Sequence, residues 1–440
     1  MTVPPGPSRW AISFLTHTRP NTSCPHATRS ARPHRSMALP PNSTMSTLPH
    51  ELLGEIFAQC AAQSPDAPLV LGAVSHLFRH ITHTTPAVWC NLDLDGARKA
   101  GHWFEMSKAC LVNVHIHIAQ VGNTEHGPTP AALESVRQHA DRVKALHLDT
   151  ETQAQARTAL AAIYADPLAL PGRTALRTLR IVTSAIAPAP GSPLASAFPA
   201  IPSIVELAVT NITLGALPGL GLDRLQRLSI VQPLRSTPLV AADLLELAHA
   251  APSLRHLHVD TRIADASPLS PIDTRFLPHL VHLHLRANNM LAVLDHVIPP
   301  SLHTLHLSDL DGRRPHASGE TGAALNRLLV RMELGRGEVK SNELRVFELE
   351  GVAVERGAPI WQRCVQRMRV LERFSVDLPA ADCPVRAEFV AVNGRPEDSR
   401  PIEAGFAFGF GAAEKGEVEM DDLLKNEFTA SEEESESESD

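Results

Sequence analysis

Five histidines in the middle of the chain recur at a spacing that could bring their imidazole rings together. They are His256 and His258, His282 and His284, and His306. Each lies in a segment of the form apolar-x-x-apolar-x-apolar, next to its fourth residue. In a strand such a side chain points away from the apolar ones. Adjacent parallel strands lie roughly 4.8 Å apart, so we predict that the five rings form one patch.

The patch has three interpretations. In the first, the histidines are solvated spacers in a chain that contains 23 of them. In the second they form a docking surface for a target protein, and in the third they are ligands of a metal. Imidazole suits zinc, but parallel ladders rarely give tetrahedral geometry without a carboxylate, and we predict no metal site. Arg227 and Glu348 occupy the flanking positions, with His147 and Arg180 further along. Histidines titrate near neutral pH, so binding there should change between about pH 7 and pH 5.5.

Catalytic and nucleotide-binding motifs are absent from the sequence. It contains no GxSxG, no HExxH and no zinc-type cysteine pair. The glycine-rich stretch 405–411 lacks both the spacing and the Lys-Ser/Thr of a phosphate loop. No serine or acid is set by spacing against a histidine. We therefore predict that the chain is not an enzyme and needs no cofactor.

Composition limits the classes of partner. The 440 residues are 43% hydrophobic, which is enough for a sizeable core. A net charge of −8 gives no electrostatic reason to bind nucleic acid. The six cysteines are scattered, as free thiols in a reducing compartment would be. No run approaches the roughly 18 apolar residues of a membrane span. We expect a soluble protein of the cytoplasm or nucleus that does not bind membranes.

Nine segments share the histidine-bearing template, and they must position the patch. They start at residues 143, 176, 204, 225, 254, 280, 302, 344 and 371. This pattern resembles leucine-rich repeats, in which each unit is a short strand followed by a helical or looser return. One strand cannot bury its apolar positions alone, but a stack of them in a parallel sheet encloses a continuous core.

The segments between and before these repeats also show periodicity. The returns at 130–142, 237–251 and 320–333 have helical patterns, residues 112–118 alternate as a strand, and a short helix is expected around Trp103 and Phe104. The asparagine that usually follows a repeat strand is in phase only at Asn288. We therefore predict an uneven solenoid.

A second organised stretch runs from Leu48 to Trp89. Apolar residues recur at helical spacing in two stripes, one on a helix that begins at Pro49 and the other on a helix containing Val70 to Ile81, before a short turn that ends at Trp89. Both stripes are wide, so one side could form core and the other a docking surface. The alternative is an ordinary helical cap.

The order of residues in this stretch resembles the F-box of basidiomycete fungal proteins. Leu-Pro-x-Glu-Leu-Leu at 48–53, Ile-Phe at 56–57, Phe-Arg at 78–79 and Thr-Pro-x-x-Trp at 85–89 carry the resemblance, over about forty residues. It departs at Phe78, where Trp is usual, and at Ser75, where Cys is usual. The resemblance implies binding to the adaptor Skp1 and through it to a cullin. The residues it assigns to helix packing and the adaptor face are Leu48, Pro49, Leu52, Ile56, Val74, Phe78 and Trp89.

The predicted fold is α/β, with a small three-helix F-box-like unit followed by an irregular leucine-rich-repeat solenoid with a parallel sheet. The predicted ranges are a disordered segment at 1–45, the F-box-like unit at 46–92, the repeats at 93–380, a terminal cap at 381–413 and a disordered acidic tail at 414–440. The first segment has two further interpretations: it resembles a mitochondrial transit peptide, or translation starts after it, at Met37 or Met45. The acidic tail has two interpretations as well, a solvating segment or a substrate of acidophilic kinases.

The resemblance implies a substrate-receptor subunit of an SCF-type (Skp1–cullin–F-box) ubiquitin ligase. The F-box would bind Skp1, and the repeats would hold a protein substrate that the sequence does not name. Such a receptor acts by proximity, raising the local concentration of an acceptor lysine. The alternative is a non-catalytic repeat scaffold whose degenerate F-box does not engage a ligase.

Overall fold

The computed structural model describes residues 48–94, 97–121, 124–164, 174–184, 197–264, 274–310, 318–335, 343–352, 359–368, 370–378 and 385–390. The predictions for 1–45, for the glycine-rich part of the terminal cap and for the acidic tail lie outside these residues. The chain divides into Met1–Pro49 and His50–Asp440. Apart from Leu48 and Pro49, the description below concerns the second unit.

Short helices open this unit: α1 (His50–Gln63), α2 (Ala67–Val74), α3 (His76–Thr84) and the 3-10 turn η2 (Pro86–Trp89). The sequence predicted a single helix through 70–81, and this was wrong. Ser75 is extended, with φ −158° and ψ 166°, and its hydroxyl accepts a hydrogen bond from the amide of Phe78 at 3.1 Å. A serine that caps the following turn in this way ends one helix and begins the next.

The core of the helical unit forms where α1 meets α3 and η2. Leu53, Phe57 and Ala61 of α1 are buried, and the ring of Phe57 meets the edge of Phe78 at a centroid distance of 4.8 Å. A Cβ at Gly54 would lie 3.0 Å from Oγ1 of Thr85. The absence of a side chain at Gly54 therefore lets α1 approach the start of η2 closely.

Two buried tryptophans join the helical unit to the sheet. Trp89 and Trp103 of α4 (Ala97–Met106) pack edge to face with centroids 4.9 Å apart. The Trp89 indole N–H donates to the carbonyl of Thr82, and that of Trp103 to the carbonyl of Asn91, each at 2.9 Å. Both indole N–H groups are therefore hydrogen-bonded although the rings are buried, as buried tryptophans usually are.

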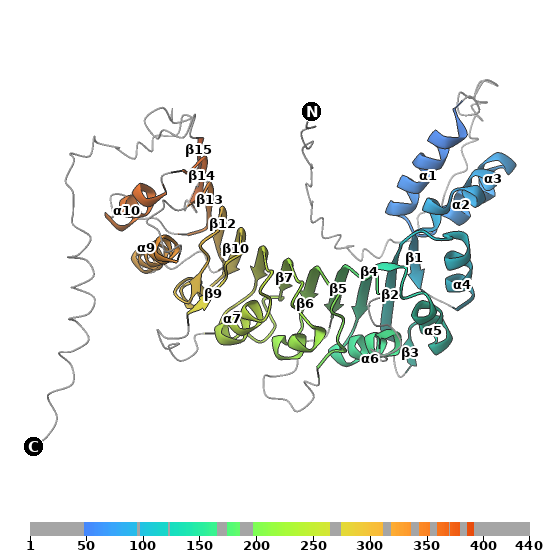
Figure 1. Ribbon diagram of the computed structural model, residues 1–440, viewed down its shortest axis with the longest axis horizontal. Helices are drawn as coiled ribbons and strands as arrows, with labels where there is room; N and C mark the ends of the chain where they lie inside the picture. Colours follow the sequence, from blue (N-terminus) through green and yellow to red (C-terminus); the bar gives the residue numbers. More distant parts are fainter. Residues whose placement is uncertain are drawn as a thin grey trace, which may run out of the picture. The chain divides into compact units, whose positions relative to one another are not determined.

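A 13-stranded sheet forms the rest of the unit (Figure 1). Its first eleven strands along the path are all parallel, and at the two ends β3 pairs antiparallel with β2 and β15 with β14. The strands are β1 (Asn91–Leu94), β2 (Val112–Val121), β3 (Thr124–His126), β4 (Val143–Thr150), β5 (Thr178–Thr183), β6 (Glu206–Thr210), β7 (Arg227–Val231), β8 (His256–Asp260), β10 (His282–Ala287), β12 (Thr304–Asp309), β13 (Val346–Glu350), β14 (Arg373–Leu378) and β15 (Val385–Val390).

All nine template segments are strands of this sheet, which confirms the predicted leucine-rich-repeat-like architecture. Strands alternate with helices, and Figure 1 shows α6, α7, α9 and α10 along one face of the sheet. The remaining elements are α5 (Pro130–Gln138), α6 (Gln153–Tyr164), η3 (Leu214–Leu220), α7 (Ala241–His249), α8 (Leu291–Leu294), α9 (Ser318–Leu334), α10 (Pro359–Arg367) and the strand pair β9 (Arg275–Phe276) and β11 (Val297–Ile298). The three predicted helical returns are α5, α7 and α9.

Polar side chains are buried just past the carboxyl ends of successive strands. Thr183 donates to the carbonyl of Asn211 at 2.7 Å, the Asn211 amide donates back to Thr183, and Thr261 donates to Gln232. Asn288, which the sequence indicated, accepts from the amide of Ile263 at 2.7 Å. Threonine, asparagine and glutamine thus share the role for which the sequence had offered only Asn288.

No helix in the described part of the chain is long and apolar enough to cross a membrane.

Candidate protein-binding surfaces

The helical unit exposes large apolar side chains on α1 and α2. Leu52 and Ile56 of α1 are 48% and 47% exposed, and Leu69, Val70 and Val74 of α2 are 50% to 65% exposed. Residues four apart on a helix share a face, so Leu52 lies beside Ile56 and Val70 beside Val74. We call these five residues the apolar face. They are half of the ten exposed large hydrophobic residues in the described part of the chain.

The other residues that the F-box resemblance singled out lie elsewhere. Pro49 is exposed and Leu48 is half-buried, just before α1. Phe78 is half-buried against Phe57. Trp89 is only 2% exposed and belongs to the core. Of this set, Leu52, Ile56 and Val74 are surface residues of the apolar face, whereas Phe78 and Trp89 pack inside the helical unit.

The sheet brings the five predicted histidines together in register. His256 on β8 is paired with His282 on β10, and His258 with His284, which in turn is paired with His306 on β12. The ring centroids are 4.4 Å apart for both β8–β10 pairs and 4.1 Å apart for His284 and His306. We call this group the histidine column. The five rings thus lie on one face of the sheet in two stacks, His256 with His282, and His258 with His284 and His306.

Polar groups border the histidine column on both sides. On β7, the hydroxyl of Ser229 shares a hydrogen bond of 3.1 Å with Nδ1 of His258. On β13, the carboxylates of Glu348 and Glu350 lie 3.7 and 3.6 Å from the two ring nitrogens of His306. The predicted neighbours Arg227 and Glu348 thus stand in register with the column.

A second pair of stacked imidazoles lies further along the same sheet face. His115 on β2 stacks on His147 on β4 at 4.5 Å, with Arg180 in register on β5. The sequence singled out His147 but not His115. The alternation of histidine and isoleucine at 115–118 was the signal that could have found it.

Burial lowers the pKa values of five histidines on this sheet face. Desolvation, with smaller contributions from neighbouring imidazoles and arginines, lowers the pKa of His256 to about 4 and that of His284 to about 3. The pKa of His147 falls to about 4, again mainly by burial. Burial also lowers the pKa values of His258 and His282. For His256, His258, His282 and His284 these directions place protonation below the ordinary pKa of 6.5, whereas the predicted change in binding between pH 7 and pH 5.5 stays a prediction.

The stacked arrangement does not suit metal binding or serine catalysis. Neighbouring rings lie against one another, with planes 7° to 42° apart, rather than converging on one ion, and no cluster of three or more potential ligands occurs in the described residues. The Ser229–His258 pair has the atoms of a nucleophile and a base. However, the neighbouring amides are committed to the strand ladders, so no backbone pair is aimed at a developing oxyanion.

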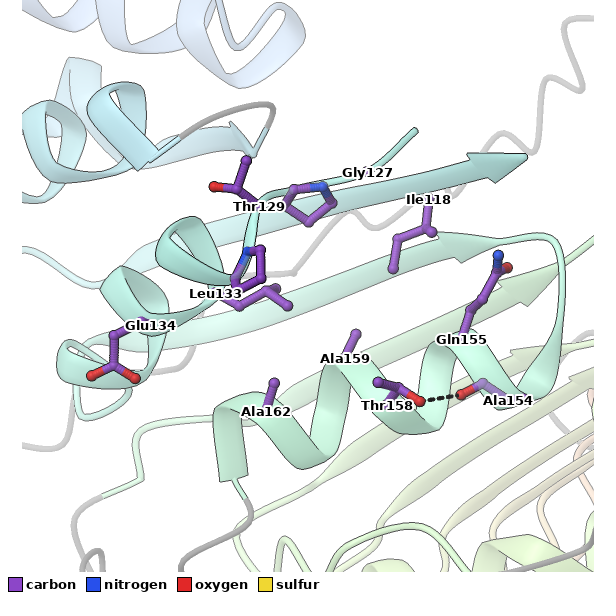
Figure 2. A pocket seen from close by; sticks show the side chains of 12 residues that line it. Ile118, Gly127, Thr129, Leu133, Glu134, Ala154, Gln155, Thr158, Ala159 and Ala162 are labelled. Carbon is purple, nitrogen blue, oxygen red and sulfur yellow. Dashed lines mark hydrogen bonds between the residues drawn. The ribbon is translucent and has the colours of Figure 1, made fainter. Parts of the chain in front are cut away.

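One cavity of about 720 Å³ lies on the helical side of the sheet, between α5, α6 and the end of β2 (Figure 2). Its wall consists mainly of apolar and small side chains, such as Ile118, Leu133 and Ala159. The polar groups at its edge are already bonded: Glu134 accepts from Arg137, and the Thr158 hydroxyl donates to the carbonyl of Ala154. It therefore lacks the convergent polar groups that orient a ligand.

Comparison of the sequence with protein-family models and with curated proteins finds no match.

Proposed function

We propose that the chain is a substrate-receptor subunit of an SCF-type ubiquitin ligase. It binds Skp1 through the apolar face and a target protein through the repeats, on the sheet face that carries the histidine column. It holds the target while other subunits transfer ubiquitin, so it needs no catalytic site or cofactor of its own. It acts in the cytoplasm or nucleus.

The apolar face is the observation that carries this proposal. Five large apolar side chains project from adjacent helices within the stretch that resembles an F-box. Exposed apolar surface on two contacting helices costs free energy in water and favours a partner that covers it. The Trp89–Trp103 contact then couples the face to the first strands of the sheet, so a bound ligase and a bound target would keep a defined geometry.

A non-catalytic scaffold is the second candidate, and Phe78 favours it. Its ring packs on Phe57 and serves the core of the unit. Phe78 stands where the F-box pattern usually has Trp. Because its ring packs inward, it contributes less to an outer surface than the exposed side chains of α1 and α2 do.

The test is a pull-down of the full-length chain with purified Skp1. We expect the wild type to bind and the Leu52→Asp, Ile56→Asp double variant to lose at least 100-fold in affinity, because two carboxylates would be buried unpaired in the interface. Leu234→Asp is the matched control, since Leu234 is 55% exposed in a loop of the repeats, and it should bind as the wild type does. Failure of the wild type to bind Skp1 would leave the scaffold.

A further inference from the structure

A row of flat side chains crosses the sheet face that carries the histidine column, and small residues interrupt it. Imidazoles occupy the row on β2 and β4 and again on β8, β10 and β12, and a guanidinium occupies it on β5. On β6 and β7 its residues are alanine and serine, and we call these two positions the row gap. The residues of the row, each paired in register with the next, are His115, His147, Arg180, Ala208, Ser229, His258, His284 and His306.

The imidazoles of this row stack along the direction that runs from strand to strand. The ring centroids are 4.5 Å apart for His115 and His147, 4.4 Å for His258 and His284, and 4.1 Å for His284 and His306. Adjacent strands are spaced by roughly 4.8 Å, so each strand adds one layer to the stack. The two strands of the row gap add none.

The residues that border the row gap can each contact an aromatic ring. On one side, His258 packs on His284, and the next residue in register beyond it is Ser229, which is too small to cover its ring. On the other side, Arg180 is exposed and forms no ion pair with a described residue. An imidazole offers a stacking face, and a guanidinium stacks on the face of an aromatic ring.

The remaining surroundings of the row gap suit an uncharged ring with a hydroxyl at its tip. A serine hydroxyl has one donor and two acceptor sites, and the hydrogen bond of Ser229 to Nδ1 of His258 uses only one of the three. Val231 follows on the same face of β7, and on the opposite side Arg227 and Glu206 face each other at 3.9 Å. The edges of the row gap therefore carry no net charge.

We propose that the row gap receives one aromatic side chain, preferably tyrosine, of the protein that binds to the repeats. The ring lies over Ser229, continues the stack on His258, and bonds through its hydroxyl to that of Ser229. Arg180 leans across Ala208 by one strand spacing, roughly 4.8 Å, and places its guanidinium on the other face of the ring. This inference rests on the part of the proposed function that places the target on the repeats, and not on binding to Skp1.

The chain cannot supply this tyrosine itself. Its only tyrosine, Tyr164 on α6, is 4% exposed. Neither another segment of the chain nor a second copy of it therefore offers the preferred residue, and the occupant belongs to a different protein.

The first experiment measures how much full-length chain is retained by resin-bound pools of short peptides. Every position is mixed except the central one, which is tyrosine, phenylalanine or leucine. Stacking and cation–π contact should make the tyrosine pool retain about ten-fold more chain than the leucine pool. The hydrogen bond to Ser229 should give it an advantage of about three-fold over the phenylalanine pool.

Equal retention by the three pools, or retention by none of them, would overturn the inference and leave the Skp1 pull-down unaffected. A chain that prefers the tyrosine pool but does not bind Skp1 would lose the ligase role and keep this site.

The variant Ala208→Phe fills the row gap with a ring of its own. Ala208 is half-buried on the open sheet face and aromatic residues are favoured in strands, so the variant should fold, which its melting temperature checks. It should lose the preference for the aromatic pools. Thr304→Phe is the matched control, because it adds the same ring to the same sheet face on β12, and it should behave as the wild type does. A wild-type preference in Ala208→Phe would contradict the proposal.

Ser229→Ala tests the contact at the tip of the ring. It keeps the row gap open and removes the hydroxyl, so retention by the tyrosine pool should fall to that by the phenylalanine pool, and both should still exceed retention by the leucine pool. A preference for tyrosine over phenylalanine that survives in Ser229→Ala would show that the hydroxyl contact is wrongly assigned.

Discussion

The apolar face and the histidine column are two exposed surfaces that the fold makes in opposite ways. On α1 an exposed residue stands next to a buried one, Leu52 beside Leu53 and Ile56 beside Phe57. Which of each pair faces water depends on where α3 and η2 pack. On the sheet, exposure alternates along every strand, and parallel register then stacks equivalent residues in one line.

This difference bears on which surface needs a partner. Exposed apolar area costs roughly 25 cal/mol per Å² relative to burial, and nothing in the described part of the chain covers the apolar face. The histidines, in contrast, pack on one another, and the outer rings reach Ser229 and Glu348 at the ends of the column. The apolar face therefore gains more from a partner, whereas the sheet surface is polar and already has ring and side-chain contacts of its own.

Trp89→Ala should have the largest effect on stability. Removing a fully buried tryptophan leaves a cavity between the helical unit and α4 and removes the donor to Thr82. We expect a loss of about 3–5 kcal/mol in the free energy of unfolding, measured by urea titration. Leu52→Ala, within the same F-box-like set, should change it by less than about 0.5 kcal/mol. Similar losses for the two variants would show that the division into core and surface is wrong.

Acid should destabilise the histidine column by an intermediate amount. Burial lowers the pKa values of four of its histidines, those on β8 and β10, below the ordinary 6.5, so between pH 6.5 and about 4 the unfolded chain binds more protons at these groups than the folded one. Stability should therefore fall as the pH drops through that window and be insensitive to these groups above it. Each ring contributes at most about 1.4 kcal/mol per pH unit, and less at these half-exposed positions because solvent screens the charge.

The variant His256→Phe, His284→Phe isolates this effect, because it keeps flat stacking rings and removes the two titrating groups. Its urea unfolding midpoint should fall less than that of the wild type between pH 7 and pH 4.5. The carboxylates that also titrate there are common to both proteins and cancel in the comparison. Parallel loss of stability in the two proteins would mean that the column does not respond to acid.

The sequence predicted the sheet far better than the helical unit, and the reason is physical. A strand's side chains alternate with period two, so the template alone placed Leu257 inside and His258 outside. Once the nine segments were taken as parallel, the register followed. The helical unit has no such rule. The break at Ser75 depends on one side-chain hydrogen bond, and the burial of Trp89 depends on α4, which follows it in the chain.

One feature was missed for want of a local signal. The polar side chains buried past the strand ends were not predicted because the expected residue was asparagine, whereas Thr183, Gln232 and Thr261 serve equally well. A polar residue at the same place in successive repeats was the signal available, and its chemical type varied.

Two serines, one from each region, give the smallest and most discriminating comparison. Ser75 caps α3, and its loss leaves the Phe78 amide without that acceptor, so Ser75→Ala should cost about 1 kcal/mol in the free energy of unfolding. Ser75→Asp should recover most of it, because aspartate is an equally good cap.

Ser229 bonds a half-exposed imidazole that water can also reach, so Ser229→Ala should cost about 0.5 kcal/mol, at the low end for a hydrogen bond. Urea unfolding gives both values, and hydrogen exchange at the Phe78 amide should quicken only in Ser75→Ala. If Ser229→Ala proved the more damaging, the histidine column would depend on that hydrogen bond far more than stacked neutral rings require.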